Sequence, residues 1–379
     1  MSVSAASRFV SFSSGDVLLN REPVVSIYVS SADLKGVSLA ADNLASDLAA
    51  VTGTAGRLCE EQEAAIVVGT LGHSPLIDRF AKQGLIDGSQ LRGCREKFLI
   101  TTIGQQLVIA GSDRRGTIYG IYELSRQIGV SPWYYWADVP TEHHDSLYIK
   151  KGVYTDGEPA VDYRGIFLND EDFGLQPWAK NKMEDSSLGN IGPKTYAAIM
   201  ELLLRLRANT LWPAMHACSR AFWDLKANIP LIMKYDIYRG SSHCEQMLCN
   251  NEYEWERFGG RRDEDWVWHS NKEMIMRYWA ARISESKDRN GIYTLGMRAV
   301  HDAGMNGYNT LEEKVAALTD IIAHQRQLIA DSIGDPTTVP QIFIPYKEVL
   351  TAYNAGLQIP EDVTLMWVDD NHGYIRQMP

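Results

Sequence analysis

The segment YRGIFLNDEDFGLQPWA, residues 163–179, ends an apolar, strand-like run in three acids, Asp170, Glu171 and Asp172. Asn, Asp and Gly are ordinary turn formers, so a solvated turn is the simplest interpretation. Carboxylates that follow a strand are also catalytic groups in barrel enzymes, whose active sites lie at the carboxyl ends of the strands. The remaining predicted strands decide between these two interpretations.

Four further predicted strands also end in side chains that can transfer a proton or hold an anion. The groups are His243 and Glu245 after 236–242, Arg298, His301 and Asp302 at the end of 292–298, Lys347 and Glu348 after 341–346, and Asp369, Asp370, Asn371 and His372 at the end of 363–369. Any one group fits turn chemistry, but five of six strand ends of this kind indicate one convergent polar ring.

Glycoside hydrolysis suits such a ring, because it needs a carboxylic acid that protonates the leaving oxygen and a second carboxylate across the scissile bond. Arg298 and Lys347 would pair with the carboxylate of an anionic sugar. Two imidazoles and a carboxylate can alternatively hold a divalent metal. The sequence has no HExxH spacing, and the two cations would repel a metal ion, so we expect no metal or other cofactor. A serine nucleophile is disfavoured too, because GSSHC is not a GxSxG elbow.

Apolar strands that alternate with helices are expected to position this ring. The predicted strands are 163–169, 208–215, 236–242, 292–298, 341–346 and 363–369, and the predicted helices between them include 192–208 and 311–334. This order predicts a parallel sheet and, with its repeats, a (β/α)8-type barrel. Six strands are two short of that barrel and would leave sheet edges bare. We therefore expect that the chain is part of a longer protein or that another segment completes the barrel.

The first part of the chain follows a different pattern. Strands are predicted at 24–30, 65–70, 97–103 and 106–112, and amphipathic helices at 38–53 and 115–130. The segment GSDRRG lacks the glycines and the Lys-Ser/Thr pair of a phosphate loop. We expect residues 1–155 to form a small α/β domain and residues 156–379 to form the partial barrel.

Composition restricts the possible partners. The net charge of −11 argues against nucleic acid or an anionic membrane as the main partner. Ten Trp and eighteen Tyr suit both a sugar-binding cleft and an ordinary core. Five scattered cysteines without a CxxC pair fit neither a disulfide framework nor a zinc site, and buried structural thiols are expected. No secretory signal or membrane span is predicted, so the compartment stays open.

Several long runs together resemble glycoside hydrolase family 115, the xylan α-1,2-glucuronidases. The runs are GSDRRGTIYGIYELSRQIGVSPWYYWADVP, RGIFLNDEDFGLQPWA, GNIGPKTYAAIMELLLRLRANTLWPAMH, GSSHCEQML, residues 290–302, FIPYKEVLTAYNAGL and VTLMWVDDNHGYIR. The resemblance is strong from about residue 100 to 379 and looser before it.

The resemblance implies an inverting enzyme that removes glucuronic or 4-O-methylglucuronic acid from glucuronoxylan. It implies a hexosaminidase-like accessory domain before a catalytic barrel, and a possible homodimer of the full-length protein. Glu348 would be the general acid, and Asp302 and Asp369 further catalytic carboxylates, with Asp302 favoured as the base and Asp170 behind them. The implied substrate-binding residues are Asn169, Asp170, His243, Arg298, Lys347 and Asn371.

The expected mechanism is a single displacement at the anomeric carbon. Glu348 would be kept protonated near neutral pH by its surroundings. Lys347 beside Glu348 would oppose that role if the two side chains faced each other. Two alternatives stay open, namely a related glycosidase such as a hexosaminidase, and an inactive or merely carbohydrate-binding fragment.

Overall fold

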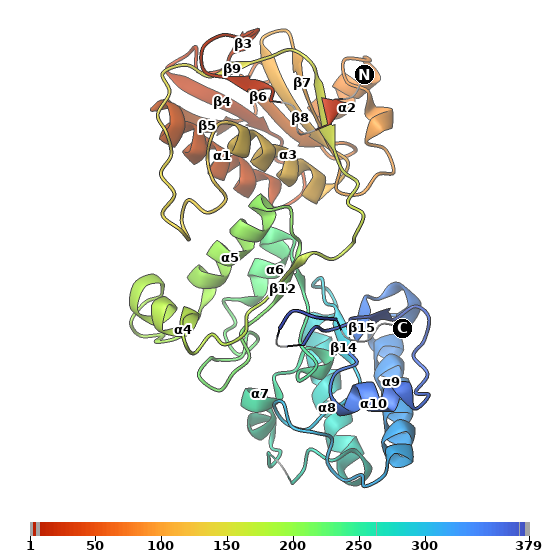
Figure 1. Cartoon of the computed structure of the whole chain (residues 1–379). Coiled ribbons are helices and arrows are strands. Elements are labelled where there is room, and N and C mark those ends of the chain that lie inside the picture. The colour runs from red at the N-terminus through yellow and green to blue at the C-terminus, as the bar shows by residue number, and fades with distance from the viewer. Residues whose placement is uncertain (1–2, 5–7, 263, 371, 376–379) are drawn as a thin grey trace. The chain divides into compact units, whose positions relative to one another are not determined.

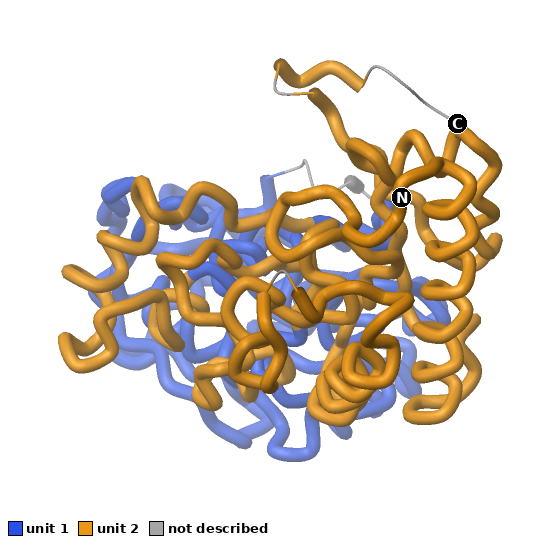
Figure 2. Tube along the Cα trace, turned by 90° about the horizontal axis from the view of Figure 1, so that it is seen from below, with its two compact units in different colours: residues 1–164, 199–209, 234–236 blue, residues 165–198, 210–233, 237–379 orange. Residues whose placement is uncertain are grey.

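The computed structural model describes residues 3–4, 8–262, 264–370 and 372–375. The chain divides into two compact units, shown in different colours in Figure 2. Unit 1 comprises residues 1–164, 199–209 and 234–236, and unit 2 comprises residues 165–198, 210–233 and 237–379.

Unit 1 is built on a seven-stranded sheet with the order β1-β10-β7-β8-β6-β4-β5. The strands are β1 (Val3–Ser4), β4 (Val24–Val29), β5 (Ala55–Cys59), β6 (Ile66–Thr70), β7 (Phe98–Ile103), β8 (Gln106–Gly111) and β10 (Val153–Asp156). Strands β5, β4, β6 and β8 are parallel, and β7 is antiparallel to both β8 and β10. A small antiparallel sheet of β2 (Val10–Ser11), β9 (Tyr148–Ile149) and β3 (Val17–Leu18) accompanies it.

Helices cover the large sheet because its strands are apolar on both faces. Helices α1 (Val37–Thr52) and α3 (Arg114–Gln127) lie side by side on one face (Figure 1). Helix α2 (Pro75–Lys82) packs its apolar residues into a hydrophobic core with side chains such as Val67 and Val108, and the turn η1 (Gly88–Gln90) lies between two further members of that core, Ile86 and Leu91. The predicted strands and helices of this part are therefore confirmed to within a few residues. The elements that were not predicted are helix α2 and strands β1, β2, β3, β5, β9 and β10.

Unit 2 contains two short parallel sheets. One has the order β11 (Gly165–Phe167), β12 (Thr210–Trp212), β13 (Tyr238–Arg239), and the other β14 (Tyr293–Leu295), β15 (Gln341–Phe343), β16 (Thr364–Leu365). A parallel bridge between Arg239 and Gly291 links β13 to the segment before β14. All six predicted strands are present and parallel, but each spans only two or three residues. The α/β class is confirmed, whereas the sheets of the described residues do not close into a barrel.

The remaining helices follow these strands. They are α4 (Leu175–Trp178), the π-helical turn η2 (Ala179–Met183), α5 (Pro193–Arg205), α6 (Ile229–Tyr235), η3 (Gln246–Leu248), α7 (Asn251–Phe258), α8 (Trp268–Ser286), α9 (Leu311–Ser332), η4 (Pro336–Thr338) and α10 (Glu348–Asn354). Helix α9 begins with a capping box in which Thr310 and Glu313 exchange side-chain and backbone hydrogen bonds. Of these helices, α5 begins at Pro193 and α9 ends close to Gly334, as the sequence predicts.

Much of the tryptophan content lies in the core of unit 2. Trp223, Trp255, Trp266 and Trp279 are at most 2% exposed. Trp266 packs against both Trp255 and Trp279 in edge-to-face contacts. These side chains stabilise the packing of α7 and α8 and are not available to a sugar. Among the described residues, no helix is long and apolar enough to cross a lipid bilayer.

Candidate active site

Five of the predicted site residues meet in one cluster in unit 2. They are His243, Arg298, Asp302, Lys347 and Glu348, and we call them the Arg298 cluster. His243 follows β13, Arg298 and Asp302 follow β14, and Lys347 and Glu348 follow β15. The carboxyl ends of parallel strands lie at one edge of a sheet, which is why segments so distant in the sequence converge.

Arg298 is the centre of this cluster. Its side chain is 2% exposed, and its Nε and Nη2 atoms donate to the two carboxylate oxygens of Glu348 at 2.8 and 2.9 Å. Nη1 donates to Oδ1 of Asp302, and Nη2 also reaches the Asp302 carbonyl oxygen at 3.3 Å. A guanidinium matches a carboxylate in two parallel hydrogen bonds, so Arg298 fixes the orientation of Glu348.

Asp302 receives more donors than any other member of the cluster. Besides Arg298, Lys347 Nζ donates to Oδ2 at 2.5 Å, and His243 Nε2 lies 3.1 Å from Oδ1. Burial alone would raise the pKa of Asp302, but the hydrogen bonds from Lys347, Arg298 and His243 hold it well below its ordinary value. Asp302 is therefore ionised across the physiological pH range.

Glu348 is not kept protonated by its surroundings, contrary to the sequence-based expectation. Burial would raise its pKa, but the hydrogen bonds and charge of Arg298 outweigh burial, and the pKa of Glu348 is lowered. The cation responsible is Arg298, because Lys347 donates to Asp302. Lys347 and Arg298 were both expected to pair with a uronate, yet here both already pair with carboxylates of the protein.

His243 contributes a neutral ring to the cluster. Burial lowers its pKa, and the opposing hydrogen bond with Asp302 does not compensate. The ring lies 4.6 Å from the Tyr346 ring, centroid to centroid. Near neutral pH this imidazole is thus a hydrogen-bonding group rather than a third cation.

Cys244 lies beside Asp302 and Arg298. Its Sγ is 3.9 Å from Asp302 Oδ1 and 4.0 Å from Arg298 Nη1. Burial raises the pKa of this thiol to about 12, so it stays protonated, as expected for a structural cysteine. His243, Cys244 and Asp302 have ligand atoms within 4.8 Å of one another, but Arg298 and Lys347 occupy the Asp302 carboxylate. That arrangement disfavours a divalent cation.

A second cluster forms around His216, which the sequence analysis did not select. Asp170, Asp172 and His216 have ligand atoms within 4.8 Å of one another. Glu171 is buried and accepts hydrogen bonds from the backbone N–H groups of Met215 and His216 at 2.9 and 2.8 Å. His216 follows the predicted strand 208–215, so its position at a strand end was the signal that identifies it.

The two clusters approach each other through histidines. The rings of His216 and His301 are 5.5 Å apart, and His301 precedes Asp302. Asp170, His301 and Lys347 all have left-handed backbone conformations, with φ of 55°, 59° and 50°. Non-glycine residues in this region are strained, and such strain is concentrated at functional sites.

Three predicted residues are not part of these contacts. Among the residues that the structure describes, no hydrogen bond or ion pair joins Asn169 or Asp369 to either cluster, and both are exposed. Asn371 lies outside the described residues. Asp370 accepts hydrogen bonds from the backbone of His372 and Tyr374, as a turn residue does.

Other strand-end acids and cavities have different roles. Glu245 is 2% exposed, and burial raises its pKa to about 8.

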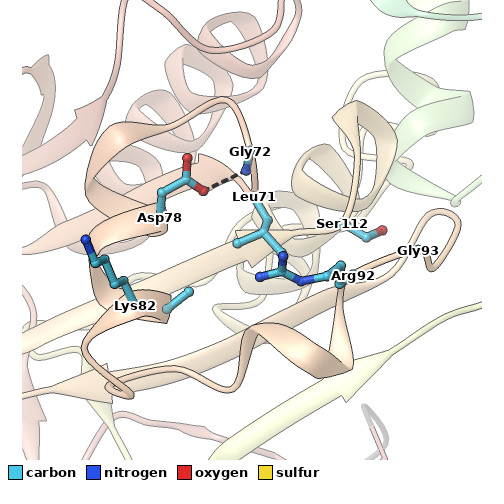
Figure 3. Close-up of a pocket in the computed structure, with 8 residues that line it drawn as sticks. Leu71, Gly72, Asp78, Lys82, Arg92, Gly93 and Ser112 are labelled. Atoms are coloured by element: carbon cyan, nitrogen blue, oxygen red, sulfur yellow. Dashed lines mark hydrogen bonds between the residues drawn. The ribbon is translucent and has the colours of Figure 1, made fainter.

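Unit 1 has a cavity of about 530 Å³ lined by residues that include Asp78, Lys82, Arg92 and Ser112 (Figure 3). In it Asp78 accepts a hydrogen bond from the Gly72 backbone at 2.7 Å, and none of the predicted site residues line it.

Comparison with known proteins gives these clusters a context. A family model described as glycosyl hydrolase family 115 matches residues 156–379. The solved structure of BtGH115A, described as a novel family GH115 4-O-methyl-α-glucuronidase with specificity for decorated arabinogalactans, is 44% identical to the chain with a TM-score of 0.90. The match covers 96% of this chain and 47% of BtGH115A, so the chain spans about half the length of that relative.

Similarity to other solved structures is limited to the fold. A chitobiase from Flavobacterium johnsoniae has a TM-score of 0.54 at 11% identity, covering 98% of this chain and 55% of that protein. An N-acetyl-β-hexosaminidase from Streptomyces plicatus has a TM-score of 0.52 at 12% identity, covering 97% and 69%. A search of curated proteins gave no significant match. Because the family match covers more than half of the sequence, the chain belongs to glycosyl hydrolase family 115.

Proposed function

We propose that the chain carries the active site of an α-glucuronidase, which hydrolyses the bond to a glucuronic or 4-O-methylglucuronic acid. The observation that carries this proposal is the Arg298 cluster, in which two carboxylates, Asp302 and Glu348, are held on one guanidinium. A glycosidase needs two carboxylates on the scissile bond, and an acidic sugar needs a cation. Family membership and the 44% identity to BtGH115A support the same reaction.

The fold proposed for this site is the (β/α)8 barrel. Its support is the series of six parallel strands in chain order, with the polar clusters at their carboxyl ends. Residues 1–155 are proposed as the accessory domain and residues 156–379 as part of the catalytic barrel. A homodimer of the full-length protein stays a prediction.

The proposed mechanism is a single displacement with inversion. Glu348 gives its proton to the glycosidic oxygen as the bond to the anomeric carbon breaks, while water attacks from the opposite face and loses a proton to a second carboxylate. Asp302 and Asp369 are the candidates for that base. A uronate that attracts Lys347 would weaken the hydrogen bond between Lys347 and Asp302, which would make Asp302 a better base.

The sugar would be bound by residues around this pair. Lys347 is the accessible cation, since 46% of its side chain is exposed, whereas 2% of Arg298 is exposed. His243 supplies a neutral ring, and Asn169, Asp170 and Asn371 are the proposed hydrogen-bonding partners of the sugar hydroxyls. In this arrangement Arg298 is a positioning residue that acts through Glu348 and Asp302.

Two polymers are candidate substrates. Glucuronoxylan is the expectation from the sequence resemblance, and the description of BtGH115A favours decorated arabinogalactans as the second. The test is to incubate the chain with aldouronic oligosaccharides from xylan and with 4-O-methylglucuronate-bearing arabinogalactan oligosaccharides, and to follow the products by proton NMR. We expect release of the free uronic acid, first as its β anomer. Appearance of the α anomer first would exclude inversion, and the absence of uronic acid from both substrates would overturn the proposed activity.

A further inference from the structure

The Arg298 cluster has no spare charge with which to receive an acidic sugar. Its two cations, Arg298 and Lys347, are paired with its two carboxylates, Asp302 and Glu348. The imidazole of His243 adds no charge near neutral pH, because burial lowers its pKa. The described cluster is therefore electrically neutral before any ligand binds.

Binding of a uronate adds one negative charge to this balanced set. The guanidinium of Arg298 cannot turn toward the ligand without leaving its hydrogen bonds to both carboxylates, since its nitrogens are all engaged and its side chain is 2% exposed. Lys347 can reach the ligand, but it is already bonded to Asp302 at 2.5 Å. A third carboxylate brought next to two others in a partly buried site favours protonation of one of them.

The partners of each carboxylate decide which one takes up the proton. Asp302 is contacted by Lys347, Arg298 and His243, whereas Arg298 alone donates side-chain hydrogen bonds to Glu348 among the described residues. Glu348 has 22% of its side chain exposed and so can exchange a proton with solvent. Protonation of Glu348 therefore weakens fewer interactions with cations than protonation of Asp302 would.

The other titratable groups near this cluster do not replace Glu348. Those within the described contacts are the Cys244 thiol, the Tyr346 phenol, His301, and the cluster of Asp170, Glu171, Asp172 and His216. Cys244 is already protonated, since burial raises its pKa to about 12.

We propose that this site binds an acidic sugar together with one proton, which Glu348 takes up. The proposal rests on the proposed function and explains how it operates. Without a ligand the general acid is ionised by Arg298, and the charge of the substrate itself produces the protonated form that cleavage needs. A neutral sugar of the same shape would not produce it, so the carboxylate of the substrate contributes to catalysis as well as to recognition.

Isothermal titration calorimetry of the chain with D-glucuronate tests the proposal directly. The titration is run at one pH in phosphate and in Tris, whose ionisation enthalpies differ, so that the dependence of the heat on the buffer gives the number of protons exchanged. We expect uptake of about one proton per uronate and a dissociation constant that rises about tenfold per pH unit between about pH 6 and 8. Saturable binding without proton uptake overturns the inference and leaves the proposed function standing.

Two controls assign the proton. Glu348→Gln should bind glucuronate without proton uptake, and uptake that persists in this variant would overturn the assignment to Glu348. The uncharged D-glucuronamide should bind without uptake, and the same uptake with the amide would show that the ligand charge is not the cause. Failure of the unmodified chain both to bind glucuronate and to release uronic acid from either polymer would overturn the proposed function itself. The wild-type titration carries the test even if the variant does not fold.

Discussion

In unit 1, Glu96 receives hydrogen bonds from Arg115 at 2.6 Å, Arg164 at 2.5 Å and Asn209 at 2.9 Å, and its side chain is 1% exposed. In unit 2, Glu348 receives two hydrogen bonds from Arg298, and its side chain is 22% exposed. Both carboxylates are bound to a guanidinium, but only Glu348 can be reached by solvent or by a ligand. Exposure of the carboxylate, together with its place at a strand end among other polar side chains, therefore separates Glu348 from the structural Glu96.

The backbone also differs between the two units, in the length of the strands and in the conformation of the residues that follow them. The central strands of unit 1 have five or six residues, and β4, β6 and β8 are each followed by a helix. The strands of unit 2 have two or three residues, and left-handed residues such as Asp170 and Lys347 follow them. Short strands with strained ends allow the chain to turn polar side chains toward one another instead of burying them.

Replacing Glu348 by Gln is the change with the largest expected effect on activity. The variant cannot donate a proton, so turnover of aldouronic oligosaccharides should fall by about 10²–10⁴-fold. Thermal unfolding should change little, because Arg298 keeps its hydrogen bond to Asp302. Initial rates and melting temperatures measured side by side check both expectations.

Asp362→Asn is the matched control for this variant. Asp362 pairs with Arg326 through two hydrogen bonds, of 2.8 and 3.1 Å, on the surface of unit 2. We expect it to retain turnover. If both variants lost activity equally, Glu348 would be no more catalytic than any other paired carboxylate.

Replacing Glu96 by Gln should lower the stability of the fold, in contrast to Glu348→Gln, which should lower turnover. The substitution leaves the partly buried guanidinium of Arg164 without its carboxylate and takes one carboxylate from that of Arg115, which keeps Asp236, and this should lower the free energy of unfolding by about 3 kcal/mol. Urea unfolding monitored by circular dichroism measures this change. Glu61→Gln, which removes an exposed pair with Arg57, should leave the free energy of unfolding almost unchanged, because solvent screens that pair. Equal values for the two variants would contradict the structural role assigned to Glu96.

The sequence predicted unit 1 well because its signals are local. Its strands are continuous apolar runs, and helix α1 ends at Gly53, whose φ of 70° suits glycine. The strands of unit 2 were placed correctly but predicted too long, because an apolar run such as TLMWV continues past the two residues that pair in β16. Apolarity shows which residues are buried, whereas ladder hydrogen bonds depend on neighbours that are distant in sequence.

The sequence predicted which residues lie in the candidate site but not which of their side chains bind each other. Strand-end position identified Asp302, Lys347 and Glu348, but no sequence pattern shows that Arg298 binds Glu348 while Lys347 binds Asp302. The ion pair with Arg298 lowers the pKa of Glu348. The sequence-based expectation of a protonated Glu348 was therefore wrong for the site without a ligand. His216 was missed because the end of its strand was read as apolar, although the imidazole immediately follows Met215.

Glu245 tests whether a buried carboxylate without a guanidinium hydrogen bond behaves differently from Glu96. Burial raises its pKa to about 8, above the value in the unfolded chain, and one of its carboxylate oxygens has no hydrogen-bond partner among the described atoms. The protonated form is thus favoured by folding. This contribution is complete at acid pH, below the unfolded-state pKa, and is lost as the pH rises toward 8.

Glu245→Gln should therefore increase the free energy of unfolding at pH 9 by about 2 kcal/mol and change it little at pH 5. The control Glu256→Gln, at an exposed position of α7, should have no pH-dependent effect. Urea unfolding at both pH values makes the comparison. A gain of equal size at pH 5 and pH 9 would show that the raised pKa is not the cause.

Lys347 gives the smallest effect, and the one that most directly separates recognition from catalysis. Its side chain is the exposed cation of the Arg298 cluster, so Lys347→Gln should weaken binding of the uronate and raise KM by about tenfold, the value of one charge-assisted hydrogen bond. Because Arg298 still orients Glu348, kcat should change much less than KM. Lys272→Gln is the control, since Lys272 pairs with Asp320 at 3.1 Å and is similarly exposed at 39%, but lies outside the cluster. A fall in kcat without a change in KM would instead place Lys347 with Arg298 as a positioning residue, acting on Asp302 through the hydrogen bond that joins them.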